Sequence, residues 1–295
     1  MSFLPRLLGP AAWLLPLAAA AQSAKPTTRT PVQAIAAAER AFAAQALQEG
    51  TKAAFLATMA DSAVVFSRAE PALARSVWSG RPAATPTDPS LHWGPAAVGA
   101  AASGELGYST GPWYIQRPDG QRVAYGQFFT IWARQPDGRF RWLLDNGISH
   151  PQPAGSPEPP ATLSFPAPGQ PPRRGSTAVL RTATALDEQL SAAGAAQGLA
   201  AAYAARLHPQ ARLLREETLP LLTPAAIRRQ LEGEAPRQLR PTGGRVARSG
   251  ELAYTYGTYQ HSAGGQPGRG SYVHLWQHGP QGWQLLAEVF NAAPQ

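Results

Sequence analysis

The chain has 295 residues, of which 44% are hydrophobic and 15% charged, and its formal net charge is +8. This length and composition suit one large domain or two ordinary domains, each with its own core. The chain has no cysteine, which excludes disulfides, cysteine-ligated zinc, iron–sulfur clusters and thiol nucleophiles.

The first residues have the pattern of a secretory signal peptide. Arg6 supplies a positive charge, a short apolar run broken by prolines follows, and small residues precede Gln22. We therefore expect residues 1–21 to be removed and the mature protein to be exported, periplasmic or secreted, with no stable membrane insertion. The alternative is an uncleaved membrane anchor, although the apolar run is short for a membrane span.

The positive charge lies mainly in the second half of the chain. Residues 30–152 hold ten Lys/Arg and nine Asp/Glu, whereas residues 173–295 hold thirteen arginines and eight Asp/Glu. Such a charge is compatible with a nucleic-acid partner. Because the arginines are scattered along the sequence, we instead expect a solvated arginine surface and no nucleic-acid partner.

The first half opens with a strong helix signal. Thr30 is a suitable N-cap, Pro31 fits the first helical position, and Gln33 completes a capping box. Gly50 marks the end of this helix. The pattern that follows predicts a second helix from Thr51 to about 61, a strand over 63–67, a third helix over 70–78 and a proline-rich loop over 81–95.

Strand patterns dominate residues 104–150. Two Asp-Gly pairs, at 119–120 and 137–138, separate the apolar runs and are typical hairpin turns. Helices followed by a run of antiparallel strands predict an α+β domain, in which the helices pack on one face of a curved sheet.

The chain then repeats itself after a linker. Residues 151–172 contain nine prolines in 22 positions, which predicts an extended, semi-rigid linker rather than a packed element. The segment Gly250–Gly257 matches Gly104–Gly111, 146 residues earlier, and such a long repeat indicates duplicated domains. The expected parts are a signal peptide (1–21), a first domain (30–150), the linker (151–172) and a second, divergent domain (173–295).

Three segments carry a family resemblance: 38–56, 104–113 and 132–141 resemble SnoaL-like, nuclear transport factor 2-like domains of bacteria. The resemblance covers residues 32–150 well and 178–292 more loosely. It implies two tandem cone-shaped α+β domains, each with three helices packed on a strongly curved antiparallel sheet around a central pocket. It also implies sheet-to-sheet dimers, which here would form within one chain. The fold hosts isomerases, dehydratases, cyclases and binding modules, so it says little about activity.

Asp145, near the end of the last strand of the first copy, is the candidate catalytic residue. In the resembling fold a carboxylate there can point into the cone, where burial would raise its pKa and suit it to proton abstraction. The alternative is that Asp145 faces solvent or pairs with an arginine. Glu288 holds the aligned place in the second copy. The candidate ligand-binding residues are Phe42, Phe55, His92, Trp93, Tyr108, Trp113 and Tyr125.

Other chemistry finds little support in the sequence. His274 and His278 lie four apart on an expected strand, too far apart for comfortable joint ligation, so we expect no metal and no cofactor. The second copy has Gln238 and Leu239 in place of His92 and Trp93, so we expect any working pocket in the first copy.

The first two helices of the first copy carry phenylalanines where enzymes of the resembling fold can use a helical tyrosine. This favours binding over catalysis, although whether the protein is an enzyme stays open. We expect an exported protein that binds a small apolar or amphipathic molecule in the first cone. The alternatives are a lyase or isomerase that uses Asp145 as general base, with Tyr108 or His92 assisting, and an interaction module of the cell envelope.

Overall fold

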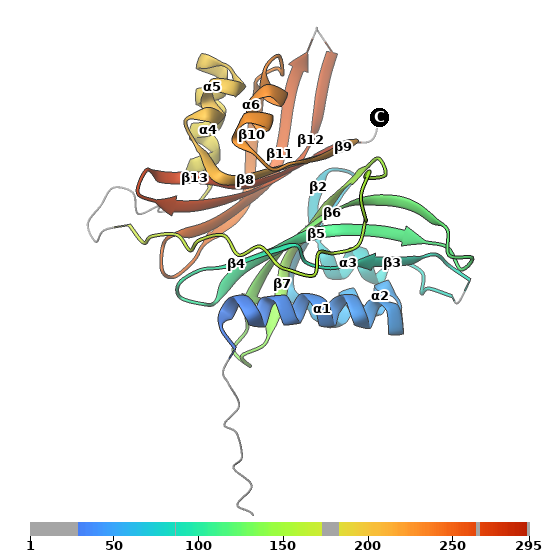
Figure 1. The fold of residues 1–295 in the computed structure, drawn as a ribbon. Helices are drawn as coiled ribbons and strands as arrows, with labels where there is room; N and C mark the ends of the chain where they lie inside the picture. The colour runs from blue at the N-terminus through green and yellow to red at the C-terminus, as the bar shows by residue number, and fades with distance from the viewer. Residues whose placement is uncertain (1–28, 86, 173–182, 264–265, 294–295) are drawn as a thin grey trace, which may run out of the picture.

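A computed structural model describes residues 29–85, 87–172, 183–263 and 266–293. The expected signal peptide lies outside these ranges. Figure 1 shows four layers: two sheets lie face to face, α1–α3 cover the outer side of one sheet, and α4–α6 cover the outer side of the other.

The start of the first domain follows its local sequence signals. The backbone N–H of Gln33 donates to Thr30 Oγ1 (3.3 Å), and the Gln33 side chain accepts from the Thr30 N–H (3.0 Å). Gly50, at a φ of 88°, separates α1 from α2. The elements are α1 (Pro31–Glu49), α2 (Thr51–Thr58), β1 (Met59–Ser67), β2 (Glu70–Leu73), α3 (Ala74–Ser79), β3 (Ser90–Trp93), β4 (Ala97–Ala100), β5 (Leu106–Gln116), β6 (Arg122–Arg134) and β7 (Phe140–His150).

The third helix is shorter than the sequence pattern predicts. Residues 70–73 form strand β2, antiparallel to β1, and α3 begins only at Ala74. Arg68 and Ala69 have φ values of 52° and 65°, and this tight turn reverses the chain. Pro71 is tolerated because β2 is an edge strand, where a missing N–H leaves no ladder bond unmade.

The second domain repeats the architecture of the first. Its strand order, β10-β11-β12-β13-β8-β9, corresponds to β3-β5-β6-β7-β1-β2, and in each sheet one parallel pair joins the first long strand to the last. Both sheets have a register shift at the same place, after Ile131 and after Leu275, and such bulges increase the local twist. The elements are α4 (Thr184–Gln197), α5 (Leu199–Ala204), β8 (Leu207–Arg215), β9 (Thr218–Leu221), α6 (Pro224–Leu231), β10 (Arg237–Val246), β11 (Leu252–Ala263), β12 (Gln266–Gly279) and β13 (Gly282–Ala292).

An apolar layer fills the space between the two sheets. It includes Phe129 and Ile131 from the first sheet and Val273 and Val289 from the second, each at most 1% exposed. Hydrophobic burial of this kind is the main favourable contribution to association of two sheets.

Reciprocal hydrogen bonds border this apolar layer. Glu105 Oε1 accepts from the backbone N–H of Arg248 (2.7 Å), and Glu251 Oε1 accepts from that of Ala102 (2.6 Å). Both pairs are related by the 146-residue repeat seen in the sequence. The two domains therefore pack as the subunits of a pseudo-symmetric dimer do, with the same patch used on each side.

The proline-rich linker is extended, but it is packed against both domains rather than free of them. Ser164 N–H donates to Ala96 O (2.8 Å), and Val98 N–H donates to Ser164 O (3.1 Å). Farther along, Gln170 N–H donates to His278 O (2.8 Å). These contacts connect the linker to β4 and β12, so it does not act as a loose spacer.

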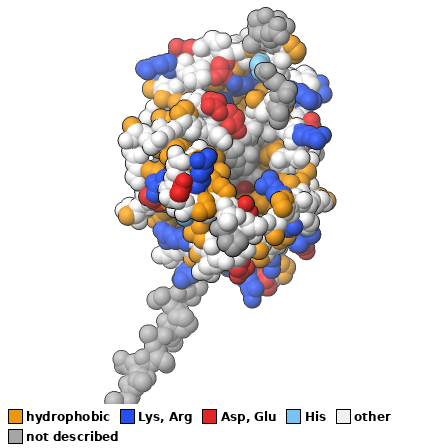
Figure 2. All heavy atoms as spheres, turned by 90° about the vertical axis from the view of Figure 1, so that its right-hand side faces the viewer, with side chains coloured by type: hydrophobic (Ala, Val, Ile, Leu, Met, Phe, Trp, Pro, Cys, Tyr) orange, Lys and Arg blue, Asp and Glu red, His pale blue; other side chains and the backbone are white. Residues whose placement is uncertain are grey.

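Charges are mixed on the face that Figure 2 shows. Acidic and basic side chains are interspersed there with apolar ones, and neither sign forms a continuous field. Within the described ranges, no helix combines the length and apolar character that a membrane crossing requires.

Candidate functional site

In the first domain a pocket of about 250 Å³ lies between the helices and the concave face of the sheet. Helix α1 contributes Phe42 and α2 contributes Phe55, whose ring centroids lie 4.7 Å apart. The walls are mostly aromatic or aliphatic, as in many small-molecule sites. The residues that line the pocket are Phe42, Phe55, Leu91, Trp93, Trp113, Ile115, Phe128, Asp145, Asn146 and Gly147.

Asp145 is the ionisable side chain among these lining residues. It lies on β7 opposite Thr130 of β6, whose hydroxyl donates to Asp145 Oδ2 (2.7 Å). Burial raises the pKa of Asp145 to about 7, the Thr130 hydrogen bond lowers it, and the nearby carboxyl of Glu39 raises it further. A carboxyl with this pKa exchanges protons close to neutral pH, which suits either proton transfer or pH-dependent binding.

Glu39 is a fully buried carboxyl on α1, beneath the pocket wall. The indole N–H of Trp93 donates to its Oε1 (2.7 Å), and the indole N–H of Trp132 donates to its Oε2 (3.2 Å). Burial raises the pKa of Glu39, while hydrogen bonds from Ser109, Trp93 and Trp132 act in the opposite direction. By fixing the Trp93 indole, Glu39 orders one wall of the pocket.

The structure brings five of the residues expected from the sequence to this pocket: Phe42, Phe55, Trp93, Trp113 and Asp145. The other three, His92, Tyr108 and Tyr125, do not line it. Side chains alternate between the two faces of a strand, so a neighbour of an inward residue points outward.

His92 follows this rule, because its neighbour Trp93 faces the pocket. The His92 ring stacks on Tyr114 with centroids 4.8 Å apart, and its Nε2 lies 2.8 Å from Ser90 Oγ. His92 also belongs to strand β3 rather than to the proline-rich loop expected over residues 81–95.

Tyr108 and Tyr125 also lie outside the pocket. Tyr108 is 2% exposed and packs in the apolar layer between the sheets, beside Phe129. Tyr125 pairs with His150 at the far end of β6 and is three residues before the inward-facing Phe128, which puts it on the opposite face. Neither tyrosine is placed to assist Asp145.

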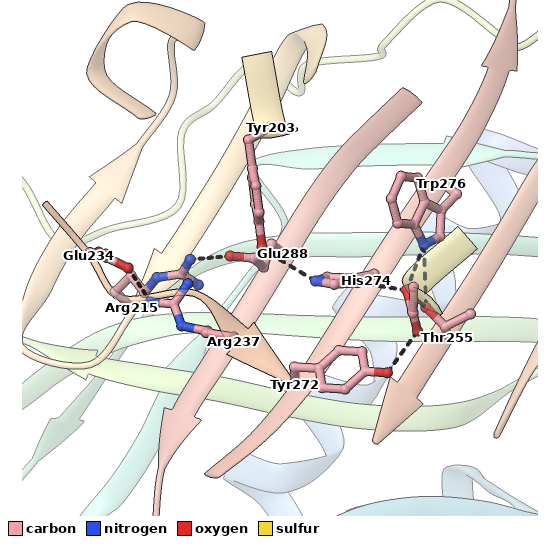
Figure 3. A network of polar contacts seen from close by, with 10 residues as sticks. Tyr203, Arg215, Glu234, Arg237, Thr255, Tyr272, His274, Trp276 and Glu288 are labelled. Atoms are coloured by element: carbon pink, nitrogen blue, oxygen red, sulfur yellow. Dashed lines mark hydrogen bonds and ion pairs between the residues drawn. The ribbon is translucent and has the colours of Figure 1, made fainter. Parts of the chain in front are cut away.

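In the second domain, polar side chains occupy the corresponding cone (Figure 3). His274 lies between two carboxylates: its Nδ1 is 2.8 Å from Asp187 Oδ1, and its Nε2 is 2.8 Å from Glu288 Oε2. The hydroxyl of Tyr203 donates to Glu288 Oε2 (2.5 Å), and Arg215 forms an ion pair with Glu288 Oε1. All of these groups are buried.

The charges in this network stabilise one another. Burial alone would lower the pKa of His274, but the charge of Asp187 and the hydrogen bonds to Asp187 and Glu288 outweigh it and raise the pKa to about 9. Burial would raise the pKa of Glu288, but Arg215 and His274 hold it well below its usual range. At neutral pH the network therefore contains an imidazolium beside the Glu288 carboxylate.

The strand registers show that bulkier side chains lie in the described part of the second cone where the first cone has its pocket. Phe128 pairs with Gly147 in the first sheet, whereas Tyr272 pairs with Phe290 in the second, so a ring stands where the first domain has a glycine. At the place of Leu91, opposite Ile115, the second domain has Arg237, opposite His261. The guanidinium groups of Arg215 and Arg237 lie over the Phe290 ring, 4.4 Å and 4.7 Å from its centroid.

Sequence reasoning missed Glu39 and Asp187, the helical carboxyls of the two cones. A signal was present, because Glu39 lies on the same helix face as Ile35, Phe42 and Ala46, and Asp187 follows the buried Leu186. A charged residue on an apolar face of a helix indicates a buried polar contact. Its partners, which come from distant strands, were not accessible from the local pattern.

A second hollow lies on the second domain. An open groove of about 650 Å³ lies near the ends of β10, β11 and β12, and its lining includes Gln260, His261 and Arg269. It lacks the enclosing apolar walls that most small-molecule sites have. Over the described parts of the chain, His, Asp and Glu side chains form no group of three or more that could hold a metal ion.

Comparisons with known proteins concern the fold alone. No protein-family model and no curated protein matches the sequence. Among solved structures, an NTF2-like protein of unknown function from Pseudomonas putida KT2440 is 16% identical, with 36% of this chain and 81% of that chain covered and a TM-score of 0.31. An NTF-2 like protein of unknown function from Shewanella oneidensis MR-1 is 14% identical, with 36% and 93% covered and a TM-score of 0.31.

A ketosteroid isomerase-like protein from Erwinia carotovora atroseptica is 12% identical, with 41% of this chain and 99% of that chain covered and a TM-score of 0.34. The element order of the two halves described above is itself that of two nuclear transport factor 2-like domains in tandem.

Proposed function

We propose that the protein binds a small apolar or amphipathic molecule in the pocket of its first domain. The observation that carries this proposal is the contrast between two cones of one architecture: the first has an aromatic-walled cavity of about 250 Å³, and in the second arginine, tyrosine and phenylalanine side chains take that place. From the amino-terminal sequence alone, we further propose that binding takes place outside the cytoplasm.

The pocket volume indicates the size of the molecular body that fits between its walls. An apolar cavity of about 150 Å³ accommodates benzene, so about 250 Å³ accommodates a molecule of about ten non-hydrogen atoms. Because the walls are mostly aromatic or aliphatic, they favour a ligand with a largely apolar body, and Asp145 offers it one polar contact.

Native mass spectrometry tests this proposal. The wild-type protein, purified gently from its own cells, should carry an added small mass. The variant Leu91→Arg, which copies Arg237 of the second domain, should lose that mass because the new side chain enters the pocket. Val123→Arg is the matched control, since Val123 is 41% exposed and lies outside the pocket.

Three outcomes decide the result. An added mass in the wild type and in Val123→Arg but not in Leu91→Arg supports the proposal. A wild type without any added mass contradicts it, as does an added mass that Leu91→Arg retains. Circular dichroism of both variants checks that a lost mass does not come from unfolding.

A second candidate function is catalysis of proton transfer, favoured by the pKa of about 7 at Asp145. In this reading, Asp145 removes a proton from a carbon next to a carbonyl group and returns it elsewhere on the substrate. Such chemistry gains most from a donor that stabilises the developing oxyanion. The polar groups of Asn146 and Trp93 on the pocket wall already donate their hydrogen bonds within the protein. Asn146 Nδ2 donates to Asn291 Oδ1 (2.8 Å), and Trp93 Nε1 donates to Glu39.

Deuterium exchange separates binding from catalysis. The protein would be incubated with phenylacetone in deuterium oxide, and exchange at the carbons next to the carbonyl would be followed by NMR. Exchange that the wild type accelerates and Asp145→Asn does not would establish Asp145 as a base. Equal exchange with and without protein leaves the binding function as the better description.

A further inference from the structure

We propose that the first-domain pocket selects a small organic cation, held between its aromatic rings and the carboxylate of Asp145. This inference rests on the proposed function and deepens it by assigning a charge to the ligand. Three independent features of the structure support it: the rings, the absence of a basic group on the described pocket wall, and the content of the second cone.

Several aromatic rings line the pocket. Phe42 and Trp93 meet edge to face with centroids 4.9 Å apart, and Phe55 lies 6.2 Å from Trp93. The face of an aromatic ring is electronegative and attracts ammonium groups within about 6 Å of its centroid. Trp93 is held in place by its hydrogen bond to Glu39, so part of this aromatic surface is ordered before a ligand arrives.

The polar groups around the pocket favour positive charge. Asp145 accepts a hydrogen bond from the hydroxyl of Thr130 on β6, and the nearby carboxyl of Glu39 on α1 raises its pKa electrostatically. The described residues that α2, β3 and β5 contribute to the wall are Phe55, Leu91, Trp93, Trp113 and Ile115, none of which titrates. Arg122, on the neighbouring strand, is engaged outside the pocket, where it lies over Tyr114 and pairs with Glu158.

The second domain shows how this architecture is occupied when the cation is part of the chain. Glu288, at the place of Asp145, forms an ion pair with Arg215, and the guanidinium groups of Arg215 and Arg237 lie over the ring of Phe290. In the first domain the place of Arg237 is taken by Leu91, and Phe290 is replaced by Gly147. The carboxylate remains, and the Phe42, Phe55 and Trp93 rings line the cavity in which Gly147 and Leu91 replace the ring and one cation of the second cone. A cationic ligand would occupy the space that these replacements leave.

Two probes of equal size test the charge of the ligand. Phenyltrimethylammonium is permanently charged, and tert-butylbenzene replaces its nitrogen by carbon; each has about ten non-hydrogen atoms, the number that the cavity accommodates. Ligand-observed NMR with the full chain gives both dissociation constants. At pH 8 we expect the cation to bind at least tenfold more tightly than the neutral probe.

The pH dependence identifies the carboxylate. The cation binds the ionised form of Asp145, whose pKa is about 7, so its affinity should fall about 100-fold between pH 9 and pH 5, while that of tert-butylbenzene stays nearly constant. In Asp145→Asn the ratio of the two affinities should fall to about one and lose its pH dependence. In Glu39→Gln, which removes a neighbouring negative charge, the midpoint should move below pH 7.

The outcomes separate this inference from the function on which it rests. If tert-butylbenzene binds as tightly as the cation, the pocket is a binding site but the inferred charge is wrong. If Asp145→Asn keeps the full preference for the cation, the carboxylate is not its partner and the inference fails. If neither probe binds at any pH, the binding function fails as well.

Discussion

The strongest quantitative prediction concerns His274 in the second cone. Its pKa is raised from 6.5 to about 9 in the folded protein, because Asp187 and Glu288 both accept from its ring. A group with a raised pKa stabilises the fold fully below its unfolded pKa and loses that contribution as the pH rises through the folded value. The 2.5-unit difference corresponds to about 3 kcal/mol of unfolding free energy, lost between pH 6.5 and pH 9.

Urea unfolding of the wild type and of His274→Gln at pH 6, 7, 8 and 9.5 measures this loss. The variant cannot carry the positive charge, so the difference in unfolding free energy between the two proteins isolates the titration of His274. We expect that difference to shrink by about 3 kcal/mol from pH 6 to pH 9.5. Contributions common to both proteins, such as the titration of Asp145, cancel.

A difference that stays constant across this range would refute the reasoning. It would mean that His274 is neutral when folded, and that one of its ring nitrogens accepts rather than donates. Neutrality would in turn require one of the two neighbouring carboxyls to hold a proton. The histidine ring signals in NMR, followed over the same pH range, provide an independent reading of the charge.

Three further predictions follow from the packing. The variant Phe55→Tyr copies Tyr203 of the second cone, and its hydroxyl should donate a hydrogen bond to Asp145. This bond should lower the pKa of Asp145 below 7, which an NMR pH titration measures. The added hydroxyl should also weaken binding of any apolar ligand, which a probe titration measures. Glu105→Ala and Glu251→Ala each leave a backbone N–H of the other domain unpaired, so each should lower the unfolding free energy by about 1.5–3 kcal/mol in urea, with similar values for the two because the contacts are reciprocal. Ile131→Ala opens a cavity between the sheets and should lower the unfolding free energy by about 2–5 kcal/mol. Val123 on the same strand is exposed, so Val123→Ala should change the unfolding free energy by less than about 0.5 kcal/mol. Similar losses for both variants would show that the layer between the sheets is not tightly packed.

Much of the fold follows from local signals in the sequence. The capping box at Thr30 and the positive-φ Gly50 bound the first helix, since caps depend on residues within one turn. The Asp-Gly pairs at 119–120 and 137–138 lie in the turns between β5 and β6 and between β6 and β7, and both glycines have positive φ. The sequence pattern predicts the start of the third helix too early, because the turn at Arg68 and Ala69 contains no glycine.

The direction of side chains was harder to predict than the strands that carry them. The sequence pattern proposed His92 and Trp93 together as ligand contacts, although neighbours on a strand must point to opposite faces. The sequence does not decide which face of β5 carries Tyr108, because a tyrosine can pack either in the cone or against another sheet. It lies in the layer between the domains because the second sheet covers that face of the first.

Local sequence signals are enough to predict the α+β class, the duplication and the strands that carry the candidate carboxylates, because caps, turns and repeats act over short stretches of chain. The tertiary structure alone decided that the first cone stays open while the second contains a charged network. That outcome depends on Phe55, Leu91 and Gly147, which come from a helix and two different strands and meet around one cavity. Whether Asp145 titrates near neutral pH is likewise decided by burial and by Glu39, 106 positions away, since desolvation and charge act through space rather than along the chain.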